Sequence, residues 1–432
     1  MLNDNAQATP GPARRFSSPP RWARWAGLVL SLVLAAAYLL KGGTHLRYFL
    51  DLEVYRAGAQ AFLHGEAIYE RDYDMGIITL PFTYPPLAAL LFAPLAWLPS
   101  APAAIAFLLL NVACAWWVMV LVLRRGAPHA SAEGWAACLL PLALLFEPVR
   151  ETIFFGQINL ILMALVCTDV LGRPRVLPRG ALVGLAAAIK LTPAVFGLYF
   201  LLNRDWKAAA WATGSGLGYT LLAAAISPGN SVTYWLDTLA NTGRIGNPSY
   251  VSNQSLQGLF YRLALEPPAL TTLWFAASLL FVALIAWAMR RLLLAHAAPA
   301  ALVANSLIAL LCSPISWTHH WVWLVPACLV AASAAVQAAR TAQAAHDPGH
   351  ARRSRGGWAA GALCAAIAAA ALLSPHWLLP NDQGRELDWP LWALPLGNSY
   401  LLLGAVFLAC VLAAPRSFAT PRTQTAPHPA AT

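Results

Sequence analysis

The segment Trp25–Leu40, with the sequence WAGLVLSLVLAAAYLL, decides the fold class because it is apolar almost throughout and close to the length that spans hydrocarbon. Comparable apolar blocks recur along the chain as far as Ala414. Apolar residues make up 59% of the 432 residues and charged residues only 11%, which excludes an ordinary soluble protein. We therefore predict an all-α polytopic membrane protein with about 10–13 membrane helices in a single bundle.

The basic residues predict the orientation of these helices. The net charge of +10 comes from arginine clusters that separate the apolar blocks, without the interleaved aromatic residues of a nucleic-acid surface. Short basic loops lie on the cytoplasmic side, so the loops at about 41–83 and 227–268 are expected outside. The transmembrane domain is expected at 23–414. The polar, Pro-rich residues 1–22 and 415–432 are expected to be disordered tails on the inner side.

One region conflicts with a simple count of crossings. If Tyr84–Leu98 and Ala103–Leu123 both crossed the membrane, Arg124 and Arg125 would lie outside. One of the two segments is therefore expected to be re-entrant, unless this arginine pair is an exception to the positive-inside rule.

The seven cysteines indicate neither a disulfide framework nor a metal centre. Each lies inside an apolar block, the chain has no CxxC, and no histidine and cysteine cluster lies nearby. The cysteines are expected to be small buried hydrophobic residues. No metal ion and no cofactor is predicted.

Asp51 is the first candidate for a functional residue. It follows the first apolar block, and six of the eighteen acidic residues lie between Asp51 and Asp74. Two interpretations of Asp51 are open: an N-cap, or a base that acts on a polar substrate at the membrane surface. A short interfacial helix that ends at Gly65 is predicted. Its apolar residues recur at helical spacing, at Leu52, Tyr55, Ala59 and Phe62.

Polar side chains also stand at the start of two later apolar blocks. Tyr84 precedes Pro85 and Pro86, which suit the first turn of a helix, so an interfacial tyrosine is one interpretation. Gln157 and Asn159 are amides that need polar partners in hydrocarbon. Helix–helix hydrogen bonds and a site for sugar hydroxyls are both open for these amides.

Lys190 interrupts the apolar stretch Gly180–Leu202, just before Thr192 and Pro193. Because proline lacks a backbone donor, the stretch is expected to form two half-length helices that are broken at Lys190. A cation at this depth needs an anionic partner. That partner is either a carboxylate of the protein or a lipid phosphate.

Two further polar stretches lie between apolar blocks. Asn253 and Ser255 belong to the second outer loop, whose polarity also suits plain exposure to solvent. His319 and His320 lie at the mouth of a helix and are flanked by tryptophans. This pair suits an anion or sugar site, or interfacial packing. A metal site is a third interpretation, which is disfavoured because no third ligand lies at a suitable spacing.

The order of these motifs resembles glycosyltransferase family 87, whose members are integral membrane enzymes of the GT-C superfamily. The family includes mannosyltransferases that depend on polyprenol-phosphate-mannose. Glu53 stands where histidine is often expected in its first motif. The matching elements, from about Trp25 to Ala339, are Asp51–Tyr55, Gly65–Tyr69, Tyr84–Leu87, Gly156–Asn159, Lys190–Pro193, Asn253–Ser255 and Ser313–His320.

The resemblance implies a GT-C-type helical bundle, a polyprenyl-phosphate sugar donor and an inverting transfer on the periplasmic face of a bacterial cytoplasmic membrane. Asp51 matches the catalytic acidic position, and His319 or His320 is expected near the donor phosphate. Lys190, Gln157, Asn159 and Tyr84 are further candidates for the donor site. Glu53, Tyr55, Asn253 and Ser255 are the candidates for the acceptor side.

The resulting hypothesis is an enzyme that moves a hexose, expected to be mannose, to a hydroxyl of a lipid or glycan acceptor. Asp51 would accept the hydroxyl proton, and Lys190 with a histidine would hold the charge of the leaving phosphate. The alternative is a transporter or flippase of lipid-linked sugars. A transporter is expected to have paired halves with matching broken helices, and these are not apparent.

Overall fold

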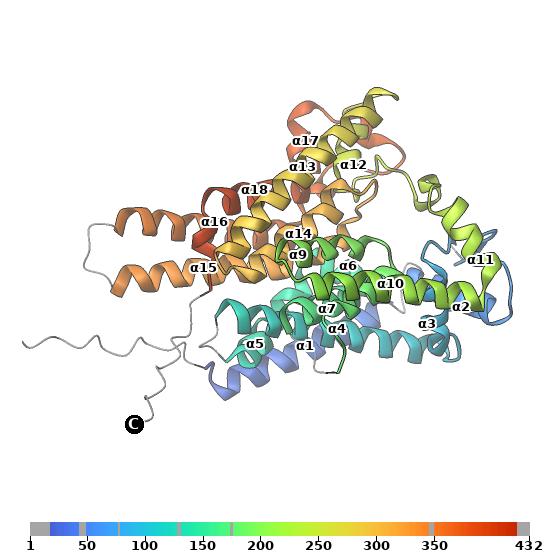
Figure 1. The fold of residues 1–432 in the computed structure, drawn as a ribbon, viewed down its shortest axis with the longest axis horizontal. Coiled ribbons are helices and arrows are strands. Elements are labelled where there is room, and N and C mark those ends of the chain that lie inside the picture. The colour runs from blue at the N-terminus through green and yellow to red at the C-terminus, as the bar shows by residue number, and fades with distance from the viewer. Residues whose placement is uncertain are drawn as a thin grey trace, which may run out of the picture.

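The structure is a computed structural model that describes residues 18–42, 49–76, 78–127, 131–172, 176–344 and 350–420. These residues form a bundle of helices, with one short antiparallel hairpin (Figure 1). The hairpin pairs β1 (Asp72–Asp74) with β2 (Thr79–Pro81). It lies beside α2 (Leu50–Leu63) in the first of the two expected outer loops.

Five helices of the described chain are long and apolar enough to cross a membrane, and counting two bent pairs raises the number to seven. One bent pair joins α6 (Glu147–Phe155) to α7 (Asn159–Cys167) and η1 (Thr168–Gly172) at 118°. The other joins η8 (Leu391–Ala393) and α17 (Leu394–Gly397) to α18 (Ser399–Ala413) at 74°. The five long helices are α1 (Arg21–Gly42), α4 (Ser100–Gly126), α13 (Ala269–Leu294), α15 (Leu324–Ala344) and α16 (His350–Leu373).

The all-α polytopic class is confirmed, but fewer helices meet the length criterion than the 10–13 expected from the apolar blocks. The reason is that several blocks fold into short helices that end at turns or prolines. These are α3 (Pro86–Ala96), α5 (Ala132–Leu145), η2 (Thr192–Phe196) with α9 (Gly197–Leu202), and α14 (Ala298–Cys312).

The remaining elements connect and cover this bundle. They are α8 (Ala181–Ile189), α10 (Trp206–Ile226), α11 (Pro228–Thr233), η3 (Tyr234–Thr238), η4 (Thr242–Ile245), α12 (Leu256–Arg262), η5 (Thr318–Trp323), η6 (Pro375–Leu378), η7 (Arg385–Asp388) and η9 (Pro415–Phe418).

Contacts among the connections divide the bundle into two ends. At the basic end, Arg124 pairs with Glu133, and Arg125 Nε donates to the carbonyl of Leu171 at 2.8 Å. The Arg179–Asp205 ion pair, with an Nη1–Oδ2 distance of 2.8 Å, belongs to the same end. The opposite end, the loop end, carries α2, the β-hairpin, α11 and residues 313–320.

The two expected outer loops meet at the loop end. The side-chain oxygen of Asn230, in α11, accepts a hydrogen bond from the backbone N–H of Ile68 at 2.9 Å. The backbone N–H of Gln254 donates to the carbonyl of Ser316 at 2.8 Å. The first loop, the second loop and the turn before η5 are therefore held together at one end.

Helix α3 explains why Arg124 and Arg125 lie at the basic end. Its 11 residues span about 16 Å, which is too short to cross hydrocarbon, and it packs along α2. The 27-residue α4 then runs from the loop end to the basic end, where Arg124 and Arg125 lie beside the other arginines. A non-crossing α3 therefore removes the conflict in the crossing count.

The break expected at Lys190 is confirmed, and it forms the apex of a hairpin. Helix α8 ends at Ile189, and Lys190 has an extended backbone with φ −146° and ψ 128°. The chain then returns through η2, which starts with Thr192 and Pro193, and through α9. The Arg179–Asp205 ion pair joins the start of α8 to the end of α9 at the basic end.

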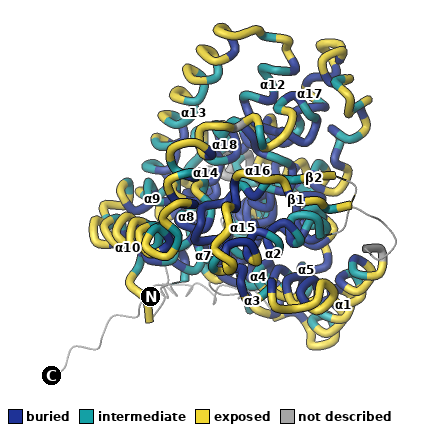
Figure 2. Tube along the Cα trace, turned by 90° about the vertical axis from the view of Figure 1, so that its right-hand side faces the viewer, coloured by how far each residue is buried: buried dark blue, intermediate teal, exposed yellow. Residues whose placement is uncertain are grey.

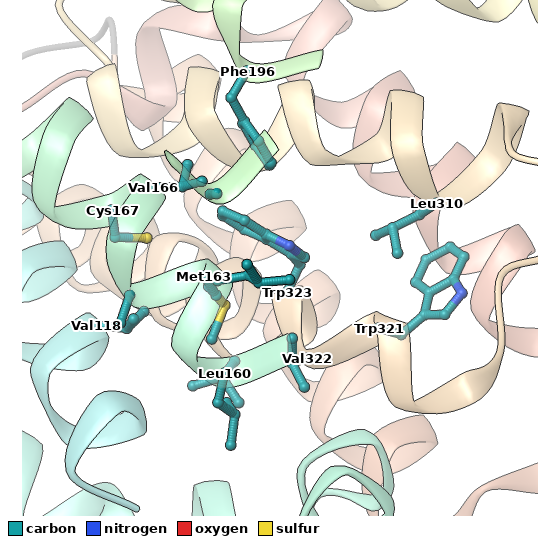
Figure 3. Close-up of a cluster of buried hydrophobic side chains, with 14 of the residues drawn as sticks. Val118, Leu160, Met163, Val166, Cys167, Phe196, Leu310, Trp321, Val322 and Trp323 are labelled. Carbon is teal, nitrogen blue, oxygen red and sulfur yellow. The ribbon is translucent and has the colours of Figure 1, made fainter. Parts of the chain in front are cut away.

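A buried hydrophobic cluster holds this hairpin against its neighbours (Figure 3). The rings of Phe196 in η2 and Trp323 in η5 stack with centroids 4.9 Å apart. Met163 and Val166 of α7 and Leu310 of α14 complete the same cluster. The packing therefore fixes the height of the Lys190 apex relative to η5 and α7.

The outer helices expose apolar faces, as a membrane-embedded bundle requires. Helices α10 and α13 are largely exposed (Figure 2). On α13, Phe275 is 60% exposed and Leu279 and Leu280 are each 58% exposed. Such a continuous apolar surface is unfavourable in water and favourable against lipid.

Ordered structure continues beyond the predicted boundary at Ala414. The η9 turn buries Phe418, and the hydroxyl of Thr420 donates to the carbonyl of His296 at 2.7 Å. The predicted tail therefore does not begin at residue 415. Residues 421–432 and most of the N-terminal tail, residues 1–17, lie outside the described residues.

Candidate active site

Asp51 lies in the first turn of α2 and does not cap it. The helix is preceded by Phe49 in a left-handed conformation with φ 57°, and no side chain caps its N-terminus. The interpretation of Asp51 as an N-cap is therefore wrong. Its carboxylate is partly buried and forms a hydrogen bond with Gln157.

The elbow between α6 and α7 places Gln157 beside α2. Gly156 ends α6 with φ 67°, a conformation that favours glycine. A Cβ atom at Gly156 would lie only 2.6 Å from Cβ of Leu52. The close approach of α2 to the elbow therefore requires glycine at this position.

Two tyrosines hold the Gln157 amide in place. The hydroxyl oxygens of Tyr55 and Tyr84 are 2.8 Å apart, and each lies 3.0 Å from Oε1 of Gln157. Because this oxygen accepts hydrogen bonds from the tyrosines, the amide N–H₂ is the group that donates to Asp51. Tyr55 lies one helical turn after Asp51, so both side chains belong to one face of α2.

The Lys190 ammonium lies next to this network. Its Nζ atom is 3.2 Å from Oδ1 of Asn159, 3.3 Å from the hydroxyl oxygen of Tyr84 and 3.3 Å from Nε2 of His320. These three partners are neutral, and Asp51 supplies the nearby negative charge. An ammonium group only donates, so the Nε2 atom of His320 accepts and its proton resides on Nδ1.

The expected histidine pair divides into two roles. His320 faces Lys190, whereas the backbone carbonyl of His319 accepts hydrogen bonds from Thr152 Oγ1 and Asn159 Nδ2, both at 3.0 Å. The ring of His319 is buried against Phe155, with centroids 5.5 Å apart. His319 therefore braces the α6–α7 elbow, and His320 belongs to the polar site.

A cavity of about 50 Å³ opens beside the polar site, at the apex of the α8–α9 hairpin. Asn159, Lys190 and His320 line its polar side. Its remaining wall is mainly apolar and comes from α7, η2, α14 and η5, with Met163, Val166, Phe196, Leu310 and Trp323. A molecule with an anionic group and a long apolar tail would match both sides.

The electrostatics of the site suit Asp51 as a base. Burial raises the pKa of Asp51 to about 6, while the Gln157 hydrogen bond and the positive charge of Lys190 act in the opposite direction. At pH 7 the carboxylate is therefore mostly ionised, yet its pKa is close enough to neutrality for efficient proton transfer. Among the described residues, no three His, Cys, Asp or Glu side chains gather as a metal site.

Three further candidates from the sequence do not join this cluster. Glu53 points away from Asp51 and pairs with Arg56, which is bound to the carbonyls of Leu95 and Leu98. Residues two apart on a helix face different directions, which explains this separation.

Asn253 and Ser255 are fully buried and brace the turn before η5. The side-chain oxygen of Asn253 accepts from the backbone N–H of Ser316 at 2.9 Å, and its amide donates to the carbonyl of Pro314 at 3.2 Å. The hydroxyl of Ser255 donates to the same carbonyl at 3.0 Å and caps α12. These two residues contact the turn that leads to His320, not the Asp51–Lys190 cluster.

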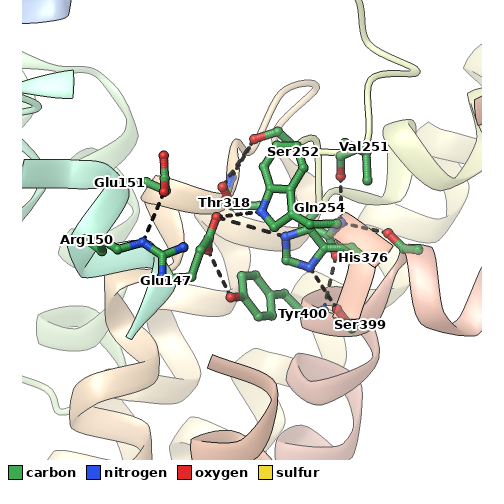
Figure 4. Close-up of polar contacts among 12 residues, drawn as sticks. Glu147, Arg150, Glu151, Val251, Ser252, Gln254, Thr318, His376, Ser399 and Tyr400 are labelled. Carbon is green, nitrogen blue, oxygen red and sulfur yellow. Dashed lines mark hydrogen bonds and ion pairs between the residues drawn. The ribbon is translucent and has the colours of Figure 1, made fainter. Parts of the chain in front are cut away.

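Sequence reasoning missed a buried polar cluster around Glu147 (Figure 4). The two carboxylate oxygens of Glu147 accept from the hydroxyl of Tyr400 at 2.9 Å and from Trp377 Nε1 at 3.0 Å. Nδ1 of His376 lies 3.1 Å from the hydroxyl of Ser399. The cluster fastens the start of α6 to α18 and η6, so the C-terminal third supports the α6–α7 elbow. A carboxylate next to Pro148 inside an apolar region was the available signal.

A carboxylate and an ammonium group therefore lie close together beside an apolar cleft, inside a bundle of apolar helices, an arrangement that suits a membrane-embedded transferase. The family model of glycosyltransferase family 87 matches residues 82–314. This chain belongs to that family, as its motifs predicted.

The curated relatives extend the match over most of the chain. A polyprenol-phosphate-mannose-dependent alpha-(1-2)-phosphatidylinositol mannoside mannosyltransferase from Mycolicibacterium smegmatis is 37% identical over 402 residues, which cover 88% of this chain and 87% of that protein. Its namesake from Mycobacterium tuberculosis is 41% identical over 321 residues, or 71% of this chain and 74% of that protein.

Among solved structures, ArnT from Cupriavidus metallidurans, crystallised with undecaprenyl phosphate, is similar to this chain with a TM-score of 0.35. The two are 16% identical over 91% of this chain and 77% of that one.

Proposed function

We propose that this protein transfers mannose from a polyprenyl-phosphate donor to a hydroxyl of a lipid-linked glycan acceptor of the phosphatidylinositol mannoside class. The names of the two mycobacterial relatives and the family match support the donor and the acceptor class. The observation that carries the proposal is the pairing of Asp51 with Lys190 across the Tyr55–Tyr84–Gln157 network.

In the proposed reaction, the Asp51 carboxylate accepts the proton of the acceptor hydroxyl as its oxygen attacks the anomeric carbon of mannose. The bond between that carbon and the phosphate oxygen breaks, and the electron pair leaves with the polyprenyl phosphate. A single in-line displacement inverts the configuration, so an α-linked product requires a β-linked donor. Gln157 keeps the carboxylate oriented through its hydrogen bond.

The leaving phosphate gains negative charge as the bond breaks. Lys190 supplies a fixed positive charge at the apex of the hairpin, and His320 offers its Nδ1–H as a donor. In a site shielded from bulk water, such groups stabilise developing charge more strongly than they would in solution. The apolar wall of the adjacent cavity suits the first isoprene units of the donor.

The proposed orientation places the loop end, and thus the site, on the outer face of a bacterial cytoplasmic membrane. Support comes from the gathering of Arg124, Arg125 and Arg179 at the opposite end, because basic loops remain on the cytoplasmic side. A lipid-linked donor suits this face, since no nucleotide needs to reach it.

The decisive experiment incubates the purified protein with radiolabelled polyprenyl-phosphate mannose and phosphatidylinositol mannosides. The wild type is expected to form a lipid with one more mannose. Asp51→Asn is expected to lower the rate at least ~100-fold while the protein remains folded. Near-normal turnover by Asp51→Asn would exclude Asp51 as the base. Movement of the intact donor across proteoliposomes without sugar transfer would favour the flippase alternative instead.

A further inference from the structure

We infer that a cleft between α1, α4 and α5 at the basic end binds an anionic phospholipid. The cleft has a volume of about 530 Å³. It lies at the end opposite Asp51, so the inference does not rest on the proposed function. Its lining residues are Arg21, Arg24, Trp25, Leu28, Trp116, Glu133, Gly134 and Ala137.

The rim of the cleft carries uncompensated positive charge. Within the described part of the chain, neither Arg21 nor Arg24 forms an ion pair, and Arg24 makes one hydrogen bond, from Nε to the carbonyl of Pro19. Glu133 is the carboxylate nearest to them in the lining, and it is already bound by both Nε and Nη2 of Arg124. Among the described residues, nothing neutralises the guanidinium groups of Arg21 and Arg24, so both can bind an anion.

The wall of the cleft is apolar and continues away from this rim. Leu28, Ala137 and the rings of Trp25 and Trp116 form it. The indole N–H of Trp116 is buried and has no hydrogen-bond partner among the described residues, so the apolar wall includes one unpaired donor. A headgroup phosphate against the arginines and an acyl chain along the wall would match this arrangement.

Close packing of α1 and α5 makes the cleft a built feature of the fold. A Cβ atom at Gly134 would lie 2.9 Å from Nε of Arg24, and a Cβ atom at Gly27 would overlap the backbone carbonyl of Ala137. The two helices lie side by side in Figure 1. The absence of side chains at the two glycines lets α1 approach α5 and sets the position of Arg24 over the cleft.

The chemistry favours a phospholipid over two other occupants. A free phosphate would use the arginines but leave the apolar wall in contact with water. The N-terminal residues 1–17 carry Arg14 and Arg15 against a single acidic residue, Asp4, so their charge has the same sign as the rim. An anionic membrane lipid satisfies both the charge and the wall.

The test measures lipid retention by the full chain with native mass spectrometry, after exposure to phosphatidylglycerol or phosphatidylcholine. The wild type is expected to retain one phosphatidylglycerol more than Arg21→Gln/Arg24→Gln. The affinity for that lipid is expected to fall on the order of tenfold or more in the double variant, because each arginine at a lipid surface contributes roughly fivefold. Arg204→Gln/Arg416→Gln is the matched control, since both arginines are exposed and the loss of charge is equal.

A second measurement avoids any change of charge. Phosphatidylglycerol with brominated acyl chains quenches the fluorescence of nearby tryptophans. The emission of Trp116, obtained as the difference between the wild type and Trp116→Phe, is expected to fall when this lipid is added. Equal retention of phosphatidylglycerol by the wild type, Arg21→Gln/Arg24→Gln and Arg204→Gln/Arg416→Gln would overturn the inference. So would equal retention of phosphatidylcholine by the wild type, or displacement of the lipid by millimolar glycerol phosphate, which would assign the arginines to a free anion.

Discussion

The ammonium of Lys190 lies 3.3 Å from the unprotonated Nε2 atom of His320. The two side chains come from segments that are far apart in the sequence, the apex of the α8–α9 hairpin and the first turn of η5. A cation whose hydrogen bonds all go to neutral acceptors keeps its charge available to a ligand. This relationship makes the first prediction possible.

Replacement of Lys190 by methionine is expected to weaken the donor step alone. Lys190→Met keeps the side-chain length but removes the charge that faces the phosphate, so the KM for the polyprenyl-phosphate sugar should rise at least ~10-fold. The KM for the acceptor should stay within about twofold. Steady-state kinetics with each substrate varied in turn checks this, and Lys207→Met, at an exposed lysine, is the control. An increase confined to the acceptor KM would remove Lys190 from the donor site.

The pH dependence of the reaction should report Asp51. Its pKa is raised to about 6, and the base must be ionised, so activity is retained above that pH and is lost below it. We expect kcat/KM to fall about tenfold for each pH unit well below 6. The measurement is initial rate against pH from 4.5 to 8 at fixed ionic strength. A flat profile down to pH 4.5 would contradict the assignment of Asp51 as the base.

Gln157 should act by positioning Asp51 rather than by binding the donor. In Gln157→Leu the carboxylate loses a hydrogen bond that stabilises its ionised form, so its pKa rises and the acidic limb of the pH profile moves to higher pH. The loss of a hydrogen bond to a charged group is expected to lower kcat roughly 10-fold. Tyr55→Phe is a milder companion, because one of the two hydroxyls next to Oε1 remains. A reduced kcat with an unmoved acidic limb would show that Gln157 acts elsewhere.

The elbow glycine should limit stability as well as activity. Gly156→Ala adds a Cβ in a left-handed conformation, 2.6 Å from Cβ of Leu52, so we expect a loss of about 2–3 kcal/mol and a lower Tm in detergent. Gly214→Ala is the control, because its Cβ meets nothing within 4 Å and the site lies in helix α10. That variant should be neutral or slightly stabilised. Equal Tm values for the two variants would rule out a tight contact between α2 and the elbow.

The orientation can be checked by thiol labelling of intact cells. A cysteine in place of Glu66, at the loop end, should react with an impermeant maleimide, whereas one in place of Arg204, at the basic end, should react only after permeabilisation. Both positions are exposed, so access across the membrane decides the result. Labelling of the Arg204 site alone in intact cells would invert the topology.

The sequence predicted local features of the site well because they depend on neighbours along the chain. The helix after Asp51, its end near Gly65 and the break at Lys190 and Pro193 follow from apolar spacing, glycine and proline. The separation of Glu53 from Asp51 was also available, since residues two apart point to different sides of a helix.

Contacts between distant segments could not be predicted in this way. Nothing along the chain relates Glu147 to Tyr400, and nothing in the motif shows that Asn253 faces Pro314 while Asn159 faces Lys190. Such pairings depend on how the helices pack, which a single sequence does not encode as a local pattern. Fewer helices than expected are long and apolar enough to cross a membrane, because short apolar blocks look alike in the sequence whether they form long or short helices.

Because Lys190 lies at the apex of the hairpin of α8, η2 and α9, the depth of this lysine can change without changing the direction of any other helix. Both legs start at the basic end, so the segment adds no net crossing, and its length can change without inverting any later helix. One extra residue in α8 would turn the apex by about 100° and raise it by about 1.5 Å. Lys190 would then leave all three of its partners while every loop kept its side of the membrane. Evolution can therefore adjust the reach of this cation one residue at a time.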